Sequence, residues 1–209
     1  WLGSMDKIKP DTNVIDRWIK KYKGPYIISD KLDGVSALLV YTKNINNIDK
    51  SEIKLYTRGN GEEGQDISHL ISLMDFPEPG KNIAIRGELI APKNKVDNSR
   101  NIIAGLVHRK KVSKNDMKNV HFVCYEIIDQ ELLPSDQTKL LKSLKHRIVN
   151  SKVYSSLSED TLKEILIKRK KDSEYDIDGI VINDNQVNKR NISGNPKYSV
   201  AFKMLFSSL

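Results

Sequence analysis

Seven short runs rich in Ile, Val, Tyr and Phe constrain the fold of this 209-residue chain more than any other feature. β-Branched and aromatic residues favour strands, and runs of this length are typical of single strands. Turn residues separate several of them, including an Asn-rich stretch at 44–47. The chain is therefore expected to fold mainly as sheets, with strands at 26–31, 37–41, 53–58, 83–90, 120–128, 178–183 and 199–204.

Helical patterns interrupt these runs at irregular intervals. The first has apolar residues four apart and stops at Gly24-Pro25. The last opens with a possible capping box, Thr161-Leu-Lys-Glu164. Because strands and helices do not alternate regularly, the pattern predicts an α+β fold with mainly antiparallel sheets and flanking helices. The helices are expected at 13–23, 66–74, 97–107, 136–150 and 159–171.

Charge and cysteine content narrow the partners and the compartment. The net charge of +8 suits nucleic acid or phosphate-rich ligands, but it equally describes a solvated basic surface. The single cysteine, Cys124, lies in an apolar run, so we expect a buried structural thiol and a reducing, intracellular location. No apolar run approaches the roughly 18 residues of a membrane span, so no membrane partner is expected.

The motif Lys31-Leu-Asp-Gly34 combines residues that suit covalent amine catalysis. The lysine follows an apolar strand, Gly34 permits a tight bend, and Asp33 lies close enough to orient the amine or its leaving group. A free lysine has a pKa of about 10.4, and it becomes a good nucleophile at neutral pH only after desolvation or the approach of a cation. Alone, the motif could equally be a β-turn with a surface lysine.

Two motifs with glycine follow. In Thr-Arg-Gly-Asn-Gly at 57–61, the glycines let the backbone approach a ligand, and Arg58 can grip a phosphate or ribose. The alternative is a hairpin tip. In Ile-Arg-Gly-Glu-Leu at 85–89, Glu88 is a carboxylate inside an apolar strand, which is costly unless it is paired or binds a metal or ribose hydroxyl. The alternative places Glu88 on the solvent face of an edge strand.

Two charged residues lie in the last apolar runs. Asp178 belongs to Asp-Ile-Asp-Gly-Ile-Val-Ile at 176–182, where an acidic pair opens a strand that we expect to be buried. Lys203 interrupts Val-Ala-Phe-Lys-Met at 200–204, and a buried lysine needs an anion, for which phosphate is the natural choice. A snorkelling lysine on a half-exposed strand is the alternative.

The order of these motifs resembles motifs I, III, IV and V of the covalent nucleotidyltransferases. Lys-x-Asp-Gly, Arg-Gly-Glu, Asp-Gly-Ile-Val and Phe-Lys follow one another between Lys31 and Lys203. That superfamily contains DNA ligases, RNA ligases and mRNA capping enzymes. The resemblance implies a covalent nucleotidyltransferase (ATP-grasp-like ligase) fold and a lysine–nucleotide intermediate.

Further segments are similar to NAD-dependent DNA ligases in particular. Thr-Arg-Gly-Asn-Gly-Glu-Glu-Gly-Gln-Asp at 57–66 resembles their Thr-Arg-Gly-Asp-Gly stretch. Asn-Ser-Arg-Asn-Ile-Ile-Ala-Gly at 98–105 resembles their Asn-Pro-Arg-Asn-Ala-Ala-Ala-Gly. Residues 2–6 resemble the segment that precedes their adenylation domain, and Phe-Val-Cys-Tyr at 122–125 resembles the strand whose tyrosine stacks on adenine.

The resemblance implies a catalytic set. Lys31 would be the nucleophile, taking AMP from NAD and expelling nicotinamide mononucleotide. Asp33 and Glu88 would support the ribose, the metal or the reacting lysine, with Mg²⁺ as the expected metal. Lys203 would bind the AMP phosphate. AMP would then pass to the 5′-phosphate of a nick in double-stranded DNA, and the 3′-hydroxyl would seal the strand during replication or repair.

Four further residues complete the expected nucleotide site by the same resemblance. Arg58 and Arg100 would contact the nucleotide or the nick phosphate. Tyr125 would pack on the adenine, and Asp178 would belong to the floor of the site. The resemblance does not assign metal ligands.

Four positions depart from the family pattern. The family usually has lysine after Asp-Gly-Val-Val-Ile, a basic residue after the Arg-Asn segment, an acid two residues before the nucleophile and aspartate in the Arg-Gly-Asp-Gly stretch. These departures indicate a divergent member, for which a viral source is one interpretation. The residues at these positions are Asn183, His108, Ser29 and Asn60.

The chain opens on Trp1 and stops soon after Lys203. We therefore expect 1–209 to be the adenylation domain alone, a monomer that works in the cytoplasm, nucleoid or a viral replication site. The family's N-terminal nicotinamide-binding piece and C-terminal OB and helix-hairpin-helix regions would lie outside it. The alternatives are an ATP-dependent polynucleotide ligase or capping-type nucleotidyltransferase, and a non-catalytic nucleic-acid-binding module. The NAD-ligase-like segments argue against the first, and Lys31 with Lys203 against the second.

Overall fold

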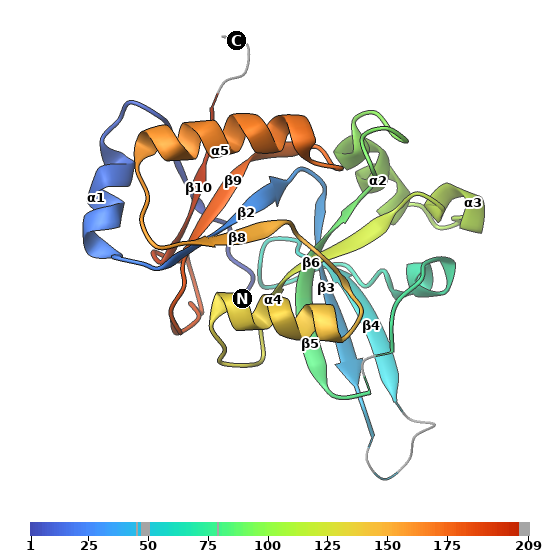
Figure 1. The fold of residues 1–209 in the computed structure, drawn as a ribbon. Coiled ribbons are helices and arrows are strands. Elements are labelled where there is room, and N and C mark those ends of the chain that lie inside the picture. Colours follow the sequence, from blue (N-terminus) through green and yellow to red (C-terminus); the bar gives the residue numbers. More distant parts are fainter. Residues whose placement is uncertain (45, 47–50, 79, 205–209) are drawn as a thin grey trace.

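The computed structural model describes residues 1–44, 46, 51–78 and 80–204, which contain ten strands in two five-stranded sheets. Figure 1 shows the two sheets beside each other, with helices on their outer faces. The predicted α+β fold with mainly antiparallel sheets is confirmed. The expected Asn-rich turn at 44–47 falls largely outside the described residues.

The first sheet carries α1 (Val14–Lys21) and α5 (Glu159–Asp172). Its buried cluster joins Ile15 and Trp18 of α1 to Leu162 and Leu166 of α5. All adjacent strands pair antiparallel except the first two, which are parallel. The strand order is β1 (Asp6–Ile8), β10 (Ser199–Phe202), β9 (Ile177–Asp184), β2 (Tyr26–Leu32) and β8 (Ser151–Tyr154).

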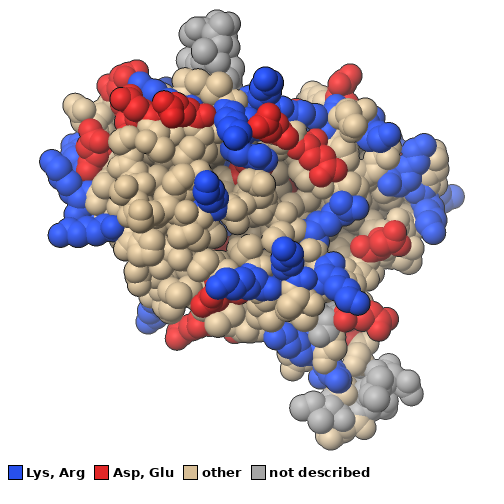
Figure 2. Space-filling model, viewed as in Figure 1, with Lys and Arg blue, Asp and Glu red and all other residues tan. Residues whose placement is uncertain are grey.

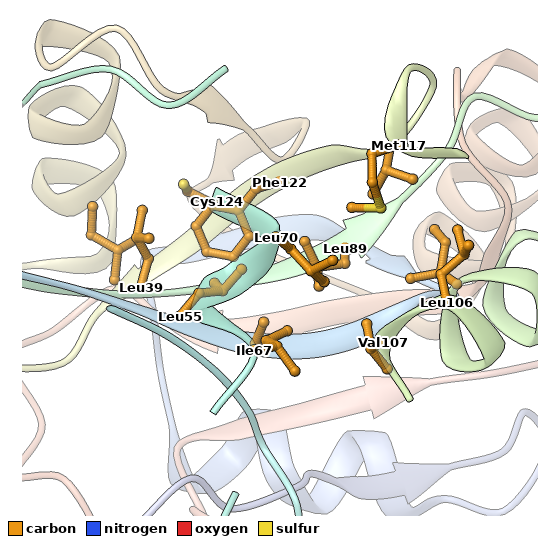
Figure 3. Packing of buried hydrophobic residues seen from close by; sticks show 14 of the residues in the cluster. Leu39, Leu55, Ile67, Leu70, Leu89, Leu106, Val107, Met117, Phe122 and Cys124 are labelled. Carbon is orange, nitrogen blue, oxygen red and sulfur yellow. The ribbon is translucent and has the colours of Figure 1, made fainter. Parts of the chain in front are cut away.

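The second sheet packs against a larger core. It runs in the order β4 (Glu52–Thr57), β3 (Val35–Thr42), β5 (Ile83–Ile90), β6 (His121–Ile127) and β7 (Arg147–Ile148), and only the last pair is parallel. The 3₁₀ helix η2 (Ser68–Leu73), α2 (Ser99–Val107), α3 (Lys114–Met117) and α4 (Pro134–Ser143) surround it. Figure 3 shows strand leucines packed with Leu70 of η2 and Leu106 of α2.

Cys124 of β6 lies in this core, as expected of a structural thiol. It is buried, and burial raises its pKa above the ordinary value for a thiol. A third, smaller cluster joins the two sheets, because it takes Leu32 from β2, Ile177 from β9, Ile90 from β5 and Val123 from β6. The end of β2, where Lys31 lies, is thereby packed against the second sheet.

Three helix predictions need correction. Residues 68–73 form a 3₁₀ helix rather than an α-helix. The helix predicted at 136–150 ends at Ser143, because Lys145 adopts a positive φ of 64° and the chain then enters β7. The cap of α5 is Ser158, whose hydroxyl accepts a hydrogen bond from the Thr161 N–H, so the proposed capping box lies one turn too late.

All seven predicted strands are present, and the sequence patterns missed β1, β7, β8 and the short helix α3. The missed strands have two to four residues, and each is an edge strand of its sheet. Their formation depends on a neighbouring strand supplying the hydrogen bonds, so a short local pattern cannot reveal them.

Candidate active site

A cleft of about 750 Å³ lies between the two sheets. Its walls include β2 and β9 from the first sheet and β5 and β6 from the second. Asp178 and Lys203 do not line the cleft but adjoin it through an ion-pair chain that starts at Lys31. Six of the eight predicted site residues line it: Lys31, Asp33, Arg58, Glu88, Arg100 and Tyr125.

Asp178 bridges the two lysines. Lys31 Nζ lies 3.1 Å from Asp178 Oδ1, and Lys203 Nζ lies 2.8 Å from Oδ2. All three side chains are about one-quarter exposed, with fractions of 22%, 27% and 26% for Lys31, Asp178 and Lys203. Burial acts to raise the pKa of Asp178, but hydrogen bonds and charge from the two lysines outweigh it and lower that pKa below its usual range. The carboxylate therefore stays ionised and holds both ammonium groups.

Strand pairing explains why these three residues meet. In the antiparallel ladder of β2 and β9, Lys31 lies opposite Gly179, the residue after Asp178. A Cβ on Gly179 would lie 2.6 Å from the Phe202 carbonyl oxygen and 3.0 Å from Lys203 Cγ. Glycine is therefore required for β10 to bring Lys203 this close. Lys203 itself lies one residue beyond β10, not inside the strand as predicted, and its anion is the Asp178 carboxylate.

The carboxylate in contact with the Lys31 amine is that of Asp178, whereas the motif suggested Asp33. The Asp33 carboxylate pairs with Arg100 at 3.3 Å, and this exposed pair joins the β2–β3 turn to α2. Gly34 lies at the bend between β2 and β3, and its φ is not in the left-handed region. A Cβ there would lie only 2.4 Å from the Leu89 carbonyl oxygen. Gly34 thus permits close contact between this turn and β5.

Glu88 is buried in the middle of the second sheet, which excludes the edge-strand alternative. It is 8% exposed, and β5 lies between β3 and β6. The Tyr125 hydroxyl donates to Glu88 Oε2 at 3.3 Å and lies 3.2 Å from the Ser36 hydroxyl. Burial raises the pKa of Glu88 to about 7, although Arg86, Lys31, the Gly34 N–H and Tyr125 oppose the shift. Burial also raises the pKa of Tyr125 to about 12.

Arg58 lies on a loop that closes one end of the cleft. Gly59 and Gly61 have φ values of 57° and 101°, a region that favours glycine, and a Cβ on Gly59 would lie 1.9 Å from the Glu63 carbonyl oxygen. The Asn60 side chain accepts hydrogen bonds from the next two backbone N–H groups after Gly61, so it shapes the loop instead of facing a ligand. Arg58 donates to the Leu2 carbonyl at 3.3 Å. The loop therefore reverses the chain, as expected of the hairpin tip that was the alternative for this motif. It also forms part of the cleft wall.

Arg86 was missed as a site residue although it lies in the same motif as Glu88. Its Nη1 donates to the Gly3 carbonyl at 2.8 Å, and its guanidinium lies 5.7 Å from the centre of the Tyr125 ring. The signal was present, because residues two apart in a strand share a face. By contrast, no local pattern reveals the ion pair between Glu126 of β6 and Arg190 of the loop after β9, which crosses the cleft.

The departures from the family pattern fall in different places. Ser29 and Asn183 line the cleft, so both take the place of the usual charged residue at the site itself. Asp30, beside Ser29, is turned away from Lys31 and pairs with Arg169. His108 ends α2 and is exposed.

A second hollow lies outside this site, between α4 and the end of α5. Figure 2 shows Lys and Arg side chains on both sides of it, and acidic residues are interspersed among them. The described part of the chain holds no group of three His, Cys, Asp or Glu side chains placed to bind a metal. Among the same residues, no helix combines the length and apolar character needed to cross a membrane.

The comparisons with known sequences agree with this arrangement. The family model of the NAD-dependent DNA ligase adenylation domain matches residues 91–207. The DNA ligase of Acanthamoeba polyphaga mimivirus is 42% identical over 97% of this chain and 33% of its own length. The putative DNA ligase 205R of Invertebrate iridescent virus 6 is 34% identical over 98% of this chain and 35% of its own length. The chain thus spans about a third of these relatives.

Solved structures confirm the fold. A Lig E DNA ligase superposes with a TM-score of 0.62 at 18% identity, over 97% of this chain and 68% of its own. An archaeal ATP-dependent RNA ligase has the same TM-score at 13% identity, over 97% of this chain and 48% of its own. At such identities the likeness establishes the fold alone, which is the covalent nucleotidyltransferase fold of DNA and RNA ligases.

The sequence similarity is more specific than the fold. The match of the family model covers more than half of the chain and includes Tyr125, Asp178 and Lys203. The viral relatives match nearly the whole chain, in keeping with the divergent pattern of its motifs. The chain therefore belongs to the family of NAD-dependent DNA ligase adenylation domains.

Proposed function

We propose that this chain is the part of an NAD-dependent DNA ligase that receives AMP from NAD on Lys31. The observation that supports the proposal is the ion-pair chain at the cleft wall, where the ionised Asp178 holds Lys31 and Lys203 side by side. This places an amine and a second cation at the point where a phosphate bound in the cleft would meet β2. A covalent amine intermediate needs this pairing of nucleophile and phosphate ligand.

The reaction is a displacement at phosphorus. The Lys31 amine, after loss of a proton, attacks the phosphorus of the adenylate half of NAD. The P–N bond forms as the P–O bond to nicotinamide mononucleotide breaks, and the leaving group departs with the electron pair on its phosphate oxygen. Lys203, which contacts Asp178 at 2.8 Å, would turn to the phosphate and neutralise the charge that develops there.

The opposite wall would hold the nucleoside. With a pKa of about 7, the Glu88 carboxyl can accept or donate a hydrogen bond to a ribose hydroxyl at neutral pH. Tyr125, fixed by Glu88 and Ser36, would pack on the adenine. Arg58 would contact the nucleotide. Mg²⁺ would take most of its ligands from phosphate and water, because the described residues offer no cluster of protein ligands.

Transfer of AMP to a nicked duplex and sealing of the strand would be activities of the full-length protein. Arg100 is 63% exposed at the rim of the cleft, where a nick phosphate could reach it. The net charge of +8 favours a polyanionic partner.

Self-adenylation tests the proposal directly. The full-length protein is incubated with NAD or ATP, and one added AMP is sought by intact-mass spectrometry and mapped to a peptide. We expect AMP on Lys31 with NAD only, and none in Lys31→Ala. Lys152→Ala, which changes an exposed lysine on β8, is the matched control and should label fully. Efficient labelling by ATP would assign the protein to the ATP-dependent ligases. Label on another lysine, or no label with either donor, would refute the proposal.

A further inference from the structure

The last turn of α5 forms an ion pair with β2, the strand that carries Lys31. Arg169 forms a two-pronged pair with Asp30, with Nε 2.8 Å from Oδ1 and Nη2 2.9 Å from Oδ2. The Asp30 side chain is only 3% exposed. Such a fork fixes both the distance and the angle between helix and strand. Asp30 immediately precedes Lys31 in the chain.

The next residue of α5 forms a hydrogen bond with the neighbouring strand, β9. Lys170 Nζ donates to the Ile177 carbonyl at 2.7 Å, and Ile177 immediately precedes Asp178. Consecutive helix residues therefore contact the residues just before Lys31 and just before its partner. Figure 1 shows α5 lying over β9 and β2.

This anchoring falls where the sheet itself is irregular. The register of β2 against β9 shifts between Lys31 and Leu32, and backbone pairing resumes beyond the shift, where the Asp33 N–H donates to the Asp176 carbonyl at 2.9 Å. The Arg169–Asp30 pair adds a side-chain constraint on β2 one residue before this irregular step. Reacting groups misplaced by about 1 Å lose on the order of a hundredfold in rate.

We propose that Arg169 is a positioning residue for the Lys31 nucleophile, acting through Asp30 from the face of the sheet opposite the Lys31 side chain. Arg169 does not line the cleft, and its fork is made with Asp30. It sets the position of the β2 backbone, and Lys170 does the same for β9. The inference rests on the proposed adenylation at Lys31.

The test separates positioning from stability with an apolar double variant. Replacing one partner leaves a buried charge unpaired, so Arg169→Met alone should lower the melting temperature by about 10 °C. In Asp30→Val/Arg169→Met both charges are removed, and an apolar pair of similar volume is often neutral or stabilising. We expect this variant to melt near the wild-type temperature, while kcat for self-adenylation by saturating NAD falls at least about tenfold. The KM for NAD should stay within about twofold, because no nucleotide contact is changed.

Two further variants make the result decisive. Lys163→Met removes an ion pair with Asp11 at the other end of α5, and it should leave kcat unchanged. Arg169→Lys keeps the charge without the fork, and it should keep most of the stability but not restore kcat. All rates are measured at a temperature where each variant is folded. A double variant or an Arg169→Lys variant that is folded and has wild-type kcat would overturn the inference. Absence of adenylation in the wild-type protein would instead refute the proposed function.

Discussion

Replacing Glu88 by glutamine should make the protein more stable at pH 8 and leave its stability almost unchanged at pH 4.5. Burial raises the pKa of Glu88 from 4.5 to about 7 in the folded protein. Between these values the folded state retains a proton that the unfolded state has released. Stability therefore falls as pH rises through this window, and above pH 7 the full cost of a buried charge is present. Glutamine never ionises and avoids that cost.

The magnitude follows from the shift. At 1.36 kcal/mol per pKa unit, the change from 4.5 to about 7 corresponds to about 3 kcal/mol. That is a large share of the roughly 5–15 kcal/mol that stabilises a typical domain. The Glu88→Gln variant should also self-adenylate more slowly than the wild type. Residues that cost stability are commonly ones that the active site requires.

Urea denaturation of wild type and variant at pH 4.5 and pH 8 measures this effect. Protonation of His121 and His146, whose pKa values are lowered by burial, affects both proteins equally and cancels in the difference. The stability difference should change by about 3 kcal/mol between the two pH values, or roughly 1 M in the denaturation midpoint. A difference that is the same at both pH values would show that Glu88 is not the buried, raised-pKa carboxyl described above.

Three further outcomes are expected. Gly34→Ala should lower the free energy of unfolding by roughly 1–3 kcal/mol in thermal denaturation, because its Cβ would meet the Leu89 carbonyl. Gly105→Ala in α2 meets nothing within 4 Å and should raise the free energy of unfolding by about 0.5–1 kcal/mol. Equal effects of the two changes would contradict the close contact at Gly34. Cys124 should resist Ellman's reagent until the protein unfolds, and rapid reaction of one thiol in the native protein would show that it is exposed. Lys203→Ala should reduce the rate of self-adenylation at least about tenfold, and a wild-type rate would make it a packing residue only.

The local sequence was sufficient to predict most of the strands and most of the residues that line the cleft. Apolar runs of β-branched and aromatic residues predicted seven of the ten described strands, because strand formation there depends on side chains within the run. The motifs placed six residues that line one cleft. Where local signals were weak, as in the two-residue β7 or the helix ended by Lys145, the prediction of structure was wrong or missing.

Only the tertiary structure decided which residues face each other. The sequence suggested Asp33, two residues away, as the partner of Lys31. The chain turns after β2, however, and the Asp33 carboxylate pairs with Arg100 of α2 instead. Antiparallel pairing of β2 with β9 instead brings Asp178 to the lysine, and packing of α5 supplies Arg169 to Asp30. Burial of Glu88 likewise requires strands on both sides of β5. These contacts join residues far apart in the chain, so composition, periodicity and spacing within a segment carry no information about them. Their energies arise only once the strands have paired and the helices have packed on the sheets.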